Sequence, residues 1–472
     1  MRSKLQQLGL IALGICAGVM ISLNFSAVAQ RDVLRPLPVE ELRAFTEVFG
    51  RIKADYVEPV EDKKLITEAI TGMLAGLDPH SAYLDQDAFR ELQVGTQGEF
   101  GGLGIEVGME DGFVKVVSPI DDSPASRAGI KSGDLIVKLD ETSVKGMTLN
   151  DAVKRMRGKP NTQITLTIVR KGEPKPILAT LTRAVIKIQS VKSKLLEPGY
   201  AYFRVTQFQE HTGETLATAI QTLFKQNQGS MKGIVLDLRN DPGGLLNGAV
   251  AVSAAFLPQN SLVVYTDGRT EDAKMRLTAS PENYVRGRVR DDYLAKLPPE
   301  IKSVPMVVLV NSGSASASEI VAGALQDHKR AVIMGTQTFG KGSVQTILPL
   351  GNNTAIKLTT ARYYTPNGRS IQAKGIVPDI ALDDGTRSDA NLRLREADLT
   401  KHLTNDRAED KAAATPVAAV NTFNFTPLPR PKDVDEKDLK PEAGEVVAKS
   451  DYELSQAIVF LKSRDTVRAS AN

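Results

Sequence analysis

Apolar residues occur at helical spacing from residue 38 to about residue 90. They recur every three or four residues, as in amphipathic helices, and comprise Leu42, Phe45, Val48, Phe49 and Ile52, then Leu65, Ile66, Ile70, Met73 and Leu74. A turn follows at Gly76–Ser81, because Asp78-Pro79 and glycine interrupt helices. We predict an N-terminal helical region, a helical cap, over residues 30–97.

The pattern changes at residue 98 to short alternating strands with glycine turns and one helix, expected at Leu149–Met156. The new region begins with a glycine-rich loop formed by Gly101, Gly102, Leu103, Gly104 and Ile105. Such a loop before an alternating strand suits close backbone approach to an extended peptide. The alternative is that these glycines only build turns. We expect a separate β-rich domain over residues 98–184.

Alternating strand and helix patterns fill residues 185–383. Ile234–Leu238 and Met306–Val310 are continuous apolar runs, as expected for strands covered on both faces. Each run ends in a glycine-bearing turn and is followed by a helix of small residues. Ligands bind beyond the carboxyl ends of such strands, so both turns are candidate site loops in an α/β core.

The remaining residues, 384–472, have a looser composition. Ala412–Pro441 is rich in proline, alanine and charge, which is typical of a flexible linker. A last amphipathic helix is predicted at Tyr452–Leu461. It could dock on another subunit or an adaptor, or pack on its own chain. The predicted fold class is therefore multidomain α/β with a flexible C-terminal tail and a terminal helix.

The first 29 residues resemble a secretory signal. Arg2 and Lys4 precede an apolar run that ends in Ala27-Val28-Ala29. We expect cleavage after Ala29 and a periplasmic location. The run is ~18 residues long, enough for an inner-membrane anchor if cleavage does not occur, and membrane contact is expected only in that case. Cys16, the only cysteine, lies in this segment, so the mature chain has no thiol for a disulfide, a metal site or a nucleophile.

The mature chain is nearly neutral. Loss of Arg2 and Lys4 from 59 basic residues leaves 57 against 56 acidic ones. This balance gives no electrostatic reason to expect nucleic acid or an anionic membrane surface as a partner.

The clearest chemical pattern is the serine-rich block Asn311–Ile320, where an apolar strand gives way to a helix. Hydroxyls at a helix start meet free backbone N–H groups and the positive end of the helix dipole. That setting suits an attacking oxygen and stabilisation of an oxyanion. A serine-rich helix start is also an ordinary capping sequence, so the block needs a base nearby.

Lysine is a better candidate for that base than histidine. None of the four histidines, at 80, 211, 328 and 402, lies in a motif typical of a Ser-His-Asp triad, and His80 beside a turn proline is expected to be structural. Lys341 lies between Gly340 and Gly342. As a base near pH 7, it needs burial to lower its pKa from ~10.4 by about 3 units. A phosphate loop is the rival interpretation, but glycine follows the lysine where that motif has serine or threonine.

Several blocks together resemble the carboxy-terminal processing (tail-specific) proteases, from the helical cap to about Asp379. Besides the serine block and Phe339–Gln345, they are Leu77–Tyr83, Asp237–Gly244, Tyr363–Arg369 and Gly375–Asp379. Residues 98–184, with Ser123–Ile136 and the helix at Leu149, resemble a PDZ domain.

The resemblance implies a serine endopeptidase with a Ser-Lys dyad. Ser316 would be the nucleophile, Lys341 the general base and Gln345 the group that orients the lysine. The oxyanion hole would use the backbone N–H of Ala317 and that of a glycine in the turn Asp241–Gly244. Gly243 is the first choice for this glycine and Gly244 the second.

The resemblance also implies partners. The loop Gly101–Ile105 would receive substrate C-termini, and Arg157 could link this domain to the core. Periplasmic or envelope proteins are the implied substrates, with a lipoprotein adaptor and a homo-oligomer as further partners. No metal or organic cofactor is expected. Ser314 and Ser318 are assigned to packing or capping, and Asp327 to a structural role.

Two other functions remain as alternatives. One is a PDZ scaffold that has lost activity, which the intact Ser316 and Lys341 disfavour. The other is a Ser-Lys acyltransferase acting on cell-wall peptides, which the missing S-x-x-K signature disfavours, since Glu319 lies three positions after Ser316.

Overall fold

The computed structural model describes residues 38–470, with gaps. The gaps are residues 121–122, 188, 287–290, 383–393, 408–422, 424, 432–437, 439–440 and 442–444. Two compact units divide the chain, at residues 1–70 and 71–472. The predicted signal segment lies outside the described residues.

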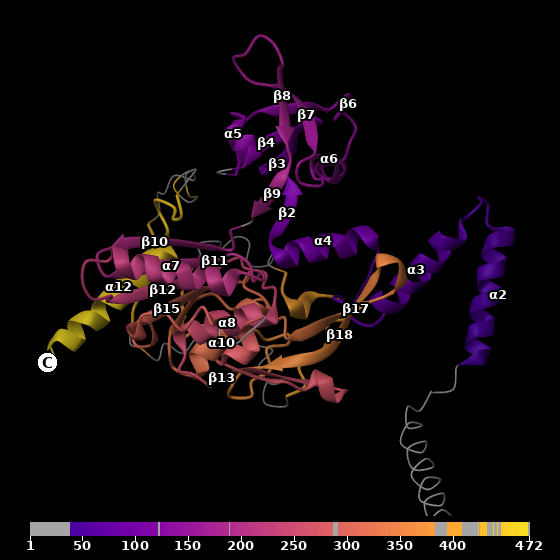
Figure 1. The fold of residues 1–472 in the computed structure, drawn as a ribbon. Coiled ribbons are helices and arrows are strands. Elements are labelled where there is room, and N and C mark those ends of the chain that lie inside the picture. The colour runs from indigo at the N-terminus through magenta and orange to yellow at the C-terminus, as the bar shows by residue number, and fades with distance from the viewer. Residues whose placement is uncertain are drawn as a thin grey trace, which may run out of the picture. The chain divides into compact units, whose positions relative to one another are not determined.

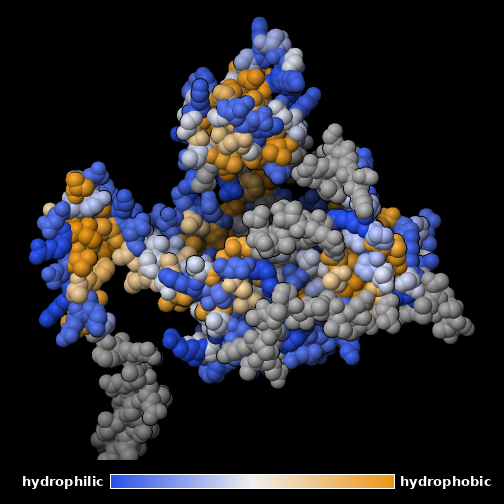
Figure 2. Space-filling model, turned by 180° about the vertical axis from the view of Figure 1, so that it is seen from behind, coloured by the Kyte–Doolittle hydropathy of each residue, from blue (hydrophilic) through white to orange (hydrophobic). Residues whose placement is uncertain are grey.

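The N-terminal unit is helical, as predicted. It contains α2 (Val39–Asp55) and the start of α3 (Asp62–Ala75). Within the described structure, α2 has no buried residue, and Figure 2 shows hydrophobic surface gathered on this unit. The exposed apolar residues of α2 are Val39, Leu42, Phe45, Val48 and Ile52. None of the helices among the described residues is long and apolar enough to cross a membrane.

After the end of α3 and a short strand at Ala82–Leu84, the second unit contains one helix and then a β-rich domain with its own core. After α4 (Gln86–Gln97), a sheet of strand order β3-β4-β5-β7-β8 forms, with β6 paired to β5. Its elements are β3 (Ile105–Glu110), β4 (Phe113–Pro119), α5 (Pro124–Arg127), β5 (Leu135–Leu139), β6 (Thr142–Ser143), α6 (Leu149–Met156), β7 (Gln163–Val169) and β8 (Ile177–Thr182). The predicted helix at Leu149–Met156 is confirmed by α6. A two-stranded sheet of β2 (Glu99–Gly102) and β9 (Ala184–Lys187) brings the two ends of this domain together.

The core contains a six-stranded sheet of order β10-β11-β12-β15-β16-β19. The strands are β10 (Val191–Glu197), β11 (Tyr200–Val205), β12 (Gly233–Asp237), β15 (Met306–Val310), β16 (Val332–Gly335) and β19 (Ile380–Ala381). All neighbouring pairs are parallel except β10 with β11. β12 and β15 confirm the two predicted apolar strands, which are fully buried.

Helices cover both faces of this sheet (Figure 1). α7 (Thr212–Gln226), α8 (Leu246–Phe256) and α10 (Ala317–Asp327) lie on one face, and α8 and α10 pack side by side. Successive side chains of β12 point to opposite faces of the sheet. Ile234 and Leu236 join the core under these helices, whereas Val235 joins the core under the C-terminal helix. That alternation explains why β12 contains no polar position before Asp237.

A second sheet has the order β1-β18-β13-β14, with β17 also paired to β18. Its strands are β1 (Ala82–Leu84), β13 (Leu262–Gly268), β14 (Arg276–Thr278), β17 (Ser343–Pro349) and β18 (Ala355–Tyr364). The short helical elements are η1 (Glu271–Ala273), α9 (Pro281–Tyr284), η3 (Pro299–Lys302), η4 (Gly351–Asn353) and η5 (Glu396–Asp398). β1 is a strand inside the region predicted as helical, because the Asp78-Pro79 turn delivers the chain to the edge of β18.

The C-terminal helix packs on its own chain, one of the two alternatives given by the sequence. α12 runs from Tyr452 to Ser470, longer than predicted, and contacts β12, β15 and β16. Its buried apolar side chains are Leu454, Ala457, Phe460 and Leu461. Most of the predicted linker lies outside the described residues.

Candidate active site

Three neighbouring parallel strands end at the candidate site. In the sheet register, Asp237 of β12 pairs with Leu309 of β15, and Val310 of β15 pairs with Gly335 of β16. The chain after β12 forms the turn that contains Gly243 and Gly244, the chain after β15 forms the serine block, and the chain after β16 leads to Lys341. The strand order therefore brings together three blocks that are far apart in the sequence.

Ser316 lies between β15 and α10 in a backbone conformation that L-residues rarely adopt, with φ 56° and ψ −111°. Such outliers cost of order 1–3 kcal/mol and persist only where the surroundings hold them. Here the Ser316 N–H donates to Glu319 Oε2 at 2.8 Å, and the next N–H begins α10. The conformation resembles that of an exposed nucleophile on a sharp strand-to-helix turn.

Glu319 joins the serine block to the lysine loop. Its side chain is fully buried and accepts four hydrogen bonds. Oε2 accepts from the backbone N–H of Ser316 at 2.8 Å and of Lys341 at 2.9 Å; Oε1 accepts from Thr338 Oγ1 at 2.5 Å and Gly340 N at 2.7 Å. The backbone nitrogens of Ser316 and Lys341 are therefore less than about 6 Å apart, since both lie within 2.9 Å of one oxygen. Burial raises the pKa of Glu319 to about 7, and the four donors limit that rise.

Lys341 lies in a tight loop whose close packing requires the glycines beside it. A Cβ on Gly342 would lie 2.3 Å from the backbone nitrogen of Gln372, and Gly340 has φ +99°. The Gly342 N–H donates to Gln372 Oε1 at 3.0 Å. Burial lowers the pKa of Lys341, and the positive charge of Lys357 lowers it further. Both effects favour the neutral amine that a base requires.

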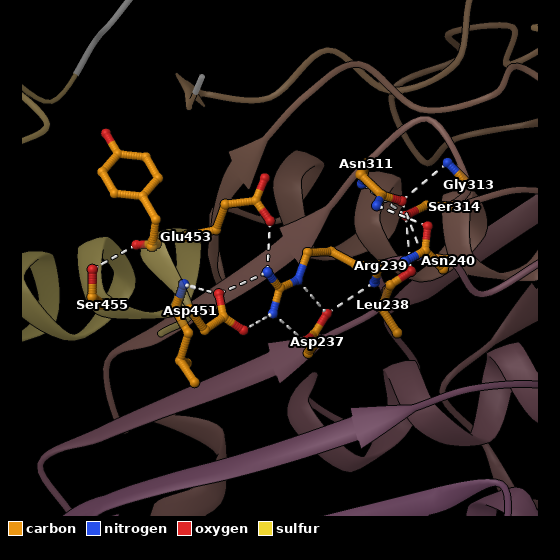
Figure 3. Close-up of polar contacts among 12 residues, drawn as sticks. Asp237, Leu238, Arg239, Asn240, Asn311, Gly313, Ser314, Asp451, Glu453 and Ser455 are labelled. Carbon is orange, nitrogen blue, oxygen red and sulfur yellow. Dashed lines mark hydrogen bonds and ion pairs between the residues drawn. The ribbon is translucent and has the colours of Figure 1, made fainter. Parts of the chain in front are cut away.

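The turn after β12 is hydrogen-bonded to the serine block at several points (Figure 3). Ser314 Oγ donates to the Leu238 carbonyl at 2.8 Å, and Ser318 Oγ donates to the Asp241 carbonyl at 2.9 Å. The Ala315 N–H also donates to the Asp241 carbonyl, at 3.0 Å. Ser314 and Ser318 thus hold the turn against the serine block.

Asp241 orders this turn through a buried carboxyl group. Oδ1 accepts from the Gly243 N–H at 2.8 Å, while Oδ2 has no partner among the described residues. Burial raises the pKa of Asp241 to about 7. A Cβ on Gly243 would lie 2.9 Å from both the Ala317 nitrogen and the Ser316 Cβ. Only glycine leaves this space next to the serine open.

Gln345 belongs to strand β17, close after the lysine loop. Its Nε2 donates to Ser343 Oγ at 2.9 Å and to Thr359 Oγ1 at 3.3 Å. No hydrogen bond between Gln345 and Lys341 occurs among the described residues. The expected orienting contact therefore stays a prediction.

The remaining polar residues singled out by the sequence lie outside the immediate site. His80 Nε2 is 2.8 Å from Glu396 Oε2, and Gln372 Nε2 donates to the other oxygen of Glu396 at 2.8 Å. His80 thus lies at the end of a hydrogen-bonded chain that reaches the lysine loop. Asp327 pairs with Arg369 and accepts the Asn367 N–H at 2.8 Å, contacts that tie the end of α10 to the Tyr363–Arg369 block.

The predicted peptide loop lines a small pocket of about 80 Å³ in the β-rich domain. The lining residues are Phe100, Gly102, Leu103, Gly104, Ile105, Val107, Val153, Met156 and Arg157. Gly101 is outside this lining, and its carbonyl accepts the Gly158 N–H at 3.0 Å. The Arg157 guanidinium lies 4.9 Å from the centre of the Phe100 ring, a cation–π distance.

Sequence reasoning missed the buried carboxyl groups of Glu319 and Asp241. A glutamate three positions after a serine at a helix start is typical of a capping box, so the contact from Glu319 to Ser316 could have been found. The hydrogen bonds that Glu319 accepts from Thr338, Gly340 and Lys341 could not have been found from the sequence. In the described part of the chain, no group of three or more His, Cys, Asp or Glu side chains could hold a metal ion.

The chain is similar to several known families and proteins. Models of peptidase family S41, of PDZ domains and of the activating protease CtpB N-terminal domain match residues 199–382, 101–181 and 22–88. The chain is 45% identical over 405 residues to a carboxy-terminal-processing protease of Bartonella bacilliformis, covering 84% of this chain and 89% of that protein.

Two more distant relatives match over similar lengths. The carboxy-terminal processing protease CtpB of Bacillus subtilis is 35% identical over 375 residues, covering 78% of this chain and 73% of the relative. The photosystem II D1 C-terminal processing protease, a solved structure, is 32% identical with a TM-score of 0.41, covering 72% of this chain and 86% of that one. The chain therefore belongs to the carboxy-terminal processing proteases, serine proteases of peptidase family S41 that carry a PDZ domain.

Proposed function

We propose that this protease is an exported endopeptidase that binds protein C-termini in its PDZ domain and cleaves envelope proteins in the periplasm through Ser316 and Lys341. The observation that carries the proposal is the shared acceptor Glu319 Oε2, which binds the backbone N–H groups of both residues. The backbones of the residues that carry the hydroxyl and the amine with a lowered pKa are therefore close together, which supports their assignment as a dyad.

The first half of the reaction is acylation. Neutral Lys341 removes the proton from Ser316 Oγ, and the oxygen attacks the peptide carbonyl carbon to form a tetrahedral intermediate. The C–N bond then breaks, and the departing nitrogen takes the proton from the Lys341 ammonium. An ester between Ser316 and the N-terminal fragment of the substrate remains.

The second half is hydrolysis of that ester. Lys341, neutral again, removes a proton from a water molecule, whose oxygen attacks the ester carbonyl. The second tetrahedral intermediate collapses with release of a carboxylic acid, and Ser316 Oγ takes back the proton from Lys341. The same amine thus acts as base and acid in each half, so its pKa must stay close to the working pH.

For the oxyanion, we favour the N–H groups of Ala317 and Gly244. Neither N–H takes part in a hydrogen bond among the described residues, whereas the Gly243 N–H donates to Asp241. Gly244 therefore ranks ahead of Gly243, in the reverse of the order chosen from the sequence. Gly243 keeps a separate task, since its missing side chain leaves the Ala317 N–H uncovered.

The PDZ pocket supports recognition of an apolar C-terminal residue. Its walls include Leu103, Val107, Val153 and Met156. Residues of the glycine-rich loop also line the pocket, and backbone N–H groups of such a loop can receive a carboxylate. Export rests on the signal pattern of residues 1–29, which also provides for membrane contact if cleavage fails.

The catalytic part is tested by Ser316→Ala, with Ser312→Ala as a matched control in the same loop. Ser312 makes no side-chain hydrogen bond among the described residues, so its loss should leave turnover unchanged. Cleavage of a denatured protein such as casein by the full chain should fall by about six orders of magnitude in Ser316→Ala. Equal turnover by the two variants would refute the assignment.

Recognition and location need their own measurements. A fluorogenic peptide with a free carboxyl terminus should be cleaved with a kcat/KM about 10–100 times that of its amide, the value of one charge-assisted contact. Envelope fractionation should place the protein in the periplasmic or inner-membrane fraction. A cytosolic pool alone would contradict export while leaving the dyad intact.

A further inference from the structure

A buried ion cluster joins the start of α12 to the end of β12 (Figure 3). At its centre is Arg239, which is only 8% exposed. Its guanidinium donates to Asp237 at 3.0 and 2.7 Å, to Asp451 at 2.9 and 2.6 Å and to Glu453 at 2.6 Å. Asp451 and Glu453 are more than 200 positions away in the sequence, so the tertiary fold alone creates this cluster.

The cluster contains more carboxyl groups than guanidinium groups. Asp237, Asp451 and Glu453 face Arg239 and Arg204, and Asp237 is fully buried. Burial acts to raise the pKa of Asp237, but the two arginines hold it below its ordinary value, whereas burial raises the pKa of Glu453. Glu453 Oε1 has no partner among the described residues. Buried ion pairs often give no net stability compared with apolar packing, so stability alone does not explain this arrangement.

Apolar contacts already attach α12 to the sheet. Leu454, Ala457, Phe460 and Leu461 pack against Val235, Val307 and Leu309 of β12 and β15. These contacts reach strands of the sheet and include no residue of the turn that carries the glycines. The ionic cluster therefore adds a contact of a different kind, directed at one residue of that turn.

Arg239 is placed where such a contact can set the geometry of the site. It begins the turn that ends at Gly243 and Gly244, and its carbonyl accepts from Arg204 at 3.2 Å. On the opposite side, the Asn240 N–H donates to Asn311 Oδ1 at 2.9 Å. The turn is thus held between the serine block and the C-terminal helix.

We infer that Asp451 and Glu453 are positioning residues of the protease: through Arg239 they hold the turn that presents the oxyanion-hole amide. The inference rests on the proposed function, in which Gly244 donates to the oxyanion. It gives α12 a role in the reaction although no residue of that helix needs to touch the substrate.

Asp451→Asn with Glu453→Gln in the full chain tests the inference. Asp451 Oδ1 also accepts the Leu454 N–H at 3.0 Å, and asparagine caps helices as well as aspartate does. The variant thus removes charge and spares the cap. The control is Lys462→Ala on the same helix. This substitution removes the ion pair between Lys462 and Glu197 of β10, whose charged atoms are 2.7 Å apart.

The measurements are kcat and KM for a fluorogenic peptide, and inhibition by a peptide aldehyde compared with the corresponding peptide amide. An aldehyde places an oxyanion in the hole, whereas the amide reports only ground-state binding. We expect kcat and aldehyde affinity to fall about tenfold together, a fraction of the loss of a whole oxyanion donor, with KM and amide affinity within twofold. Lys462→Ala should match the wild type.

Other outcomes decide against the inference. If kcat and the ratio of aldehyde to amide affinity stay within twofold of wild type well below the melting temperature, the cluster is only structural. If the double variant does not fold, Glu453→Gln alone is the test, because Asp451 then keeps both contacts to Arg239. We expect this variant to lose about threefold in kcat and in aldehyde affinity. Failure of the proposed function is a separate result, since Ser316→Ala would then retain wild-type turnover.

Discussion

Gly243→Ala is the substitution whose effect can be worked out most fully from the structure. Gly243 has φ +97°, and an added Cβ would lie 2.7 Å from the Ala315 carbonyl oxygen and 2.9 Å from the Ala317 nitrogen. Heavy atoms in contact normally lie about 3.5–4.0 Å apart. The serine block or the turn must therefore move by at least about half an ångström.

Two costs follow, and they can be separated. An alanine at this φ costs about 1–3 kcal/mol of stability. A shift of half an ångström takes the proposed oxyanion amides out of the 2.7–3.1 Å range they need, which costs about 100- to 1000-fold in kcat, or about 3–4 kcal/mol. The first cost lowers the melting temperature, and the second lowers kcat of the folded enzyme.

Gly172→Ala is the matched control. Gly172 lies between β7 and β8 with φ +93° and has nothing within 4 Å of an added Cβ. Gly172→Ala therefore has the same cost of placing alanine at a positive φ, but its added Cβ contacts no neighbouring atom. Thermal unfolding and steady-state hydrolysis of a fluorogenic peptide should give both variants lowered melting temperatures, and only Gly243→Ala a lowered kcat. A kcat for Gly243→Ala within threefold of Gly172→Ala would refute the reasoning.

Two pH-dependent effects complete the predictions. Lys357→Met removes a like charge from the surroundings of Lys341, so the pKa of Lys341 should rise. The acid limb of the pH profile of kcat/KM then moves to higher pH, with the same plateau above it. An unchanged acid limb would contradict Lys341 as the base. For Asp241, whose pKa burial raises to about 7, the folded state keeps a proton that the unfolded chain releases near pH 4, so its contribution to stability is lost as pH rises from about 4 through 7. Asp241→Asn should remove this loss. The unfolding free energy of the variant minus that of the wild type should therefore increase between pH 4 and pH 8, by up to about 4 kcal/mol. If this difference between the two proteins stays constant across that range, Asp241 does not titrate there.

The sequence predicted local structure well where the apolar pattern is strong. The run Met306–Val310 is β15, and Leu149–Met156 is α6. Both depend on periodicity and on nearby glycine or capping residues, which act over a few positions. β1 was missed because three residues carry too little pattern, and only pairing with β18 makes them a strand.

The polar connections of the site were not predictable in the same way. Glu319 looked only like the residue that breaks an S-x-x-K signature, yet three of its four donors come from residues 19 to 22 positions away. Arg239 finds Asp451 at a separation of 212 positions. One sequence gives no pattern for such contacts, since nothing periodic links their members. The φ of Ser316 is equally hidden, because serine has no intrinsic preference for it.

The order of the strands explains how these separate pieces can serve one reaction. β12, β15 and β16 are parallel neighbours, so their carboxyl ends place the glycine turn, the serine block and the lysine loop in that order along one edge. Neighbouring strands lie about 4.8 Å apart, so the turn with the proposed Gly244 amide and the loop with the proposed base flank the serine block, which itself carries the proposed Ala317 amide. Two buried carboxyl groups accept backbone N–H groups in these loops. Asp241 accepts the Gly243 N–H within the turn, and Glu319 accepts the N–H groups of Ser316 and Lys341 and so joins the serine block to the lysine loop. Because both carboxyl groups have pKa values raised to about 7, the hydrogen bonds that hold these loops should respond to pH around that value.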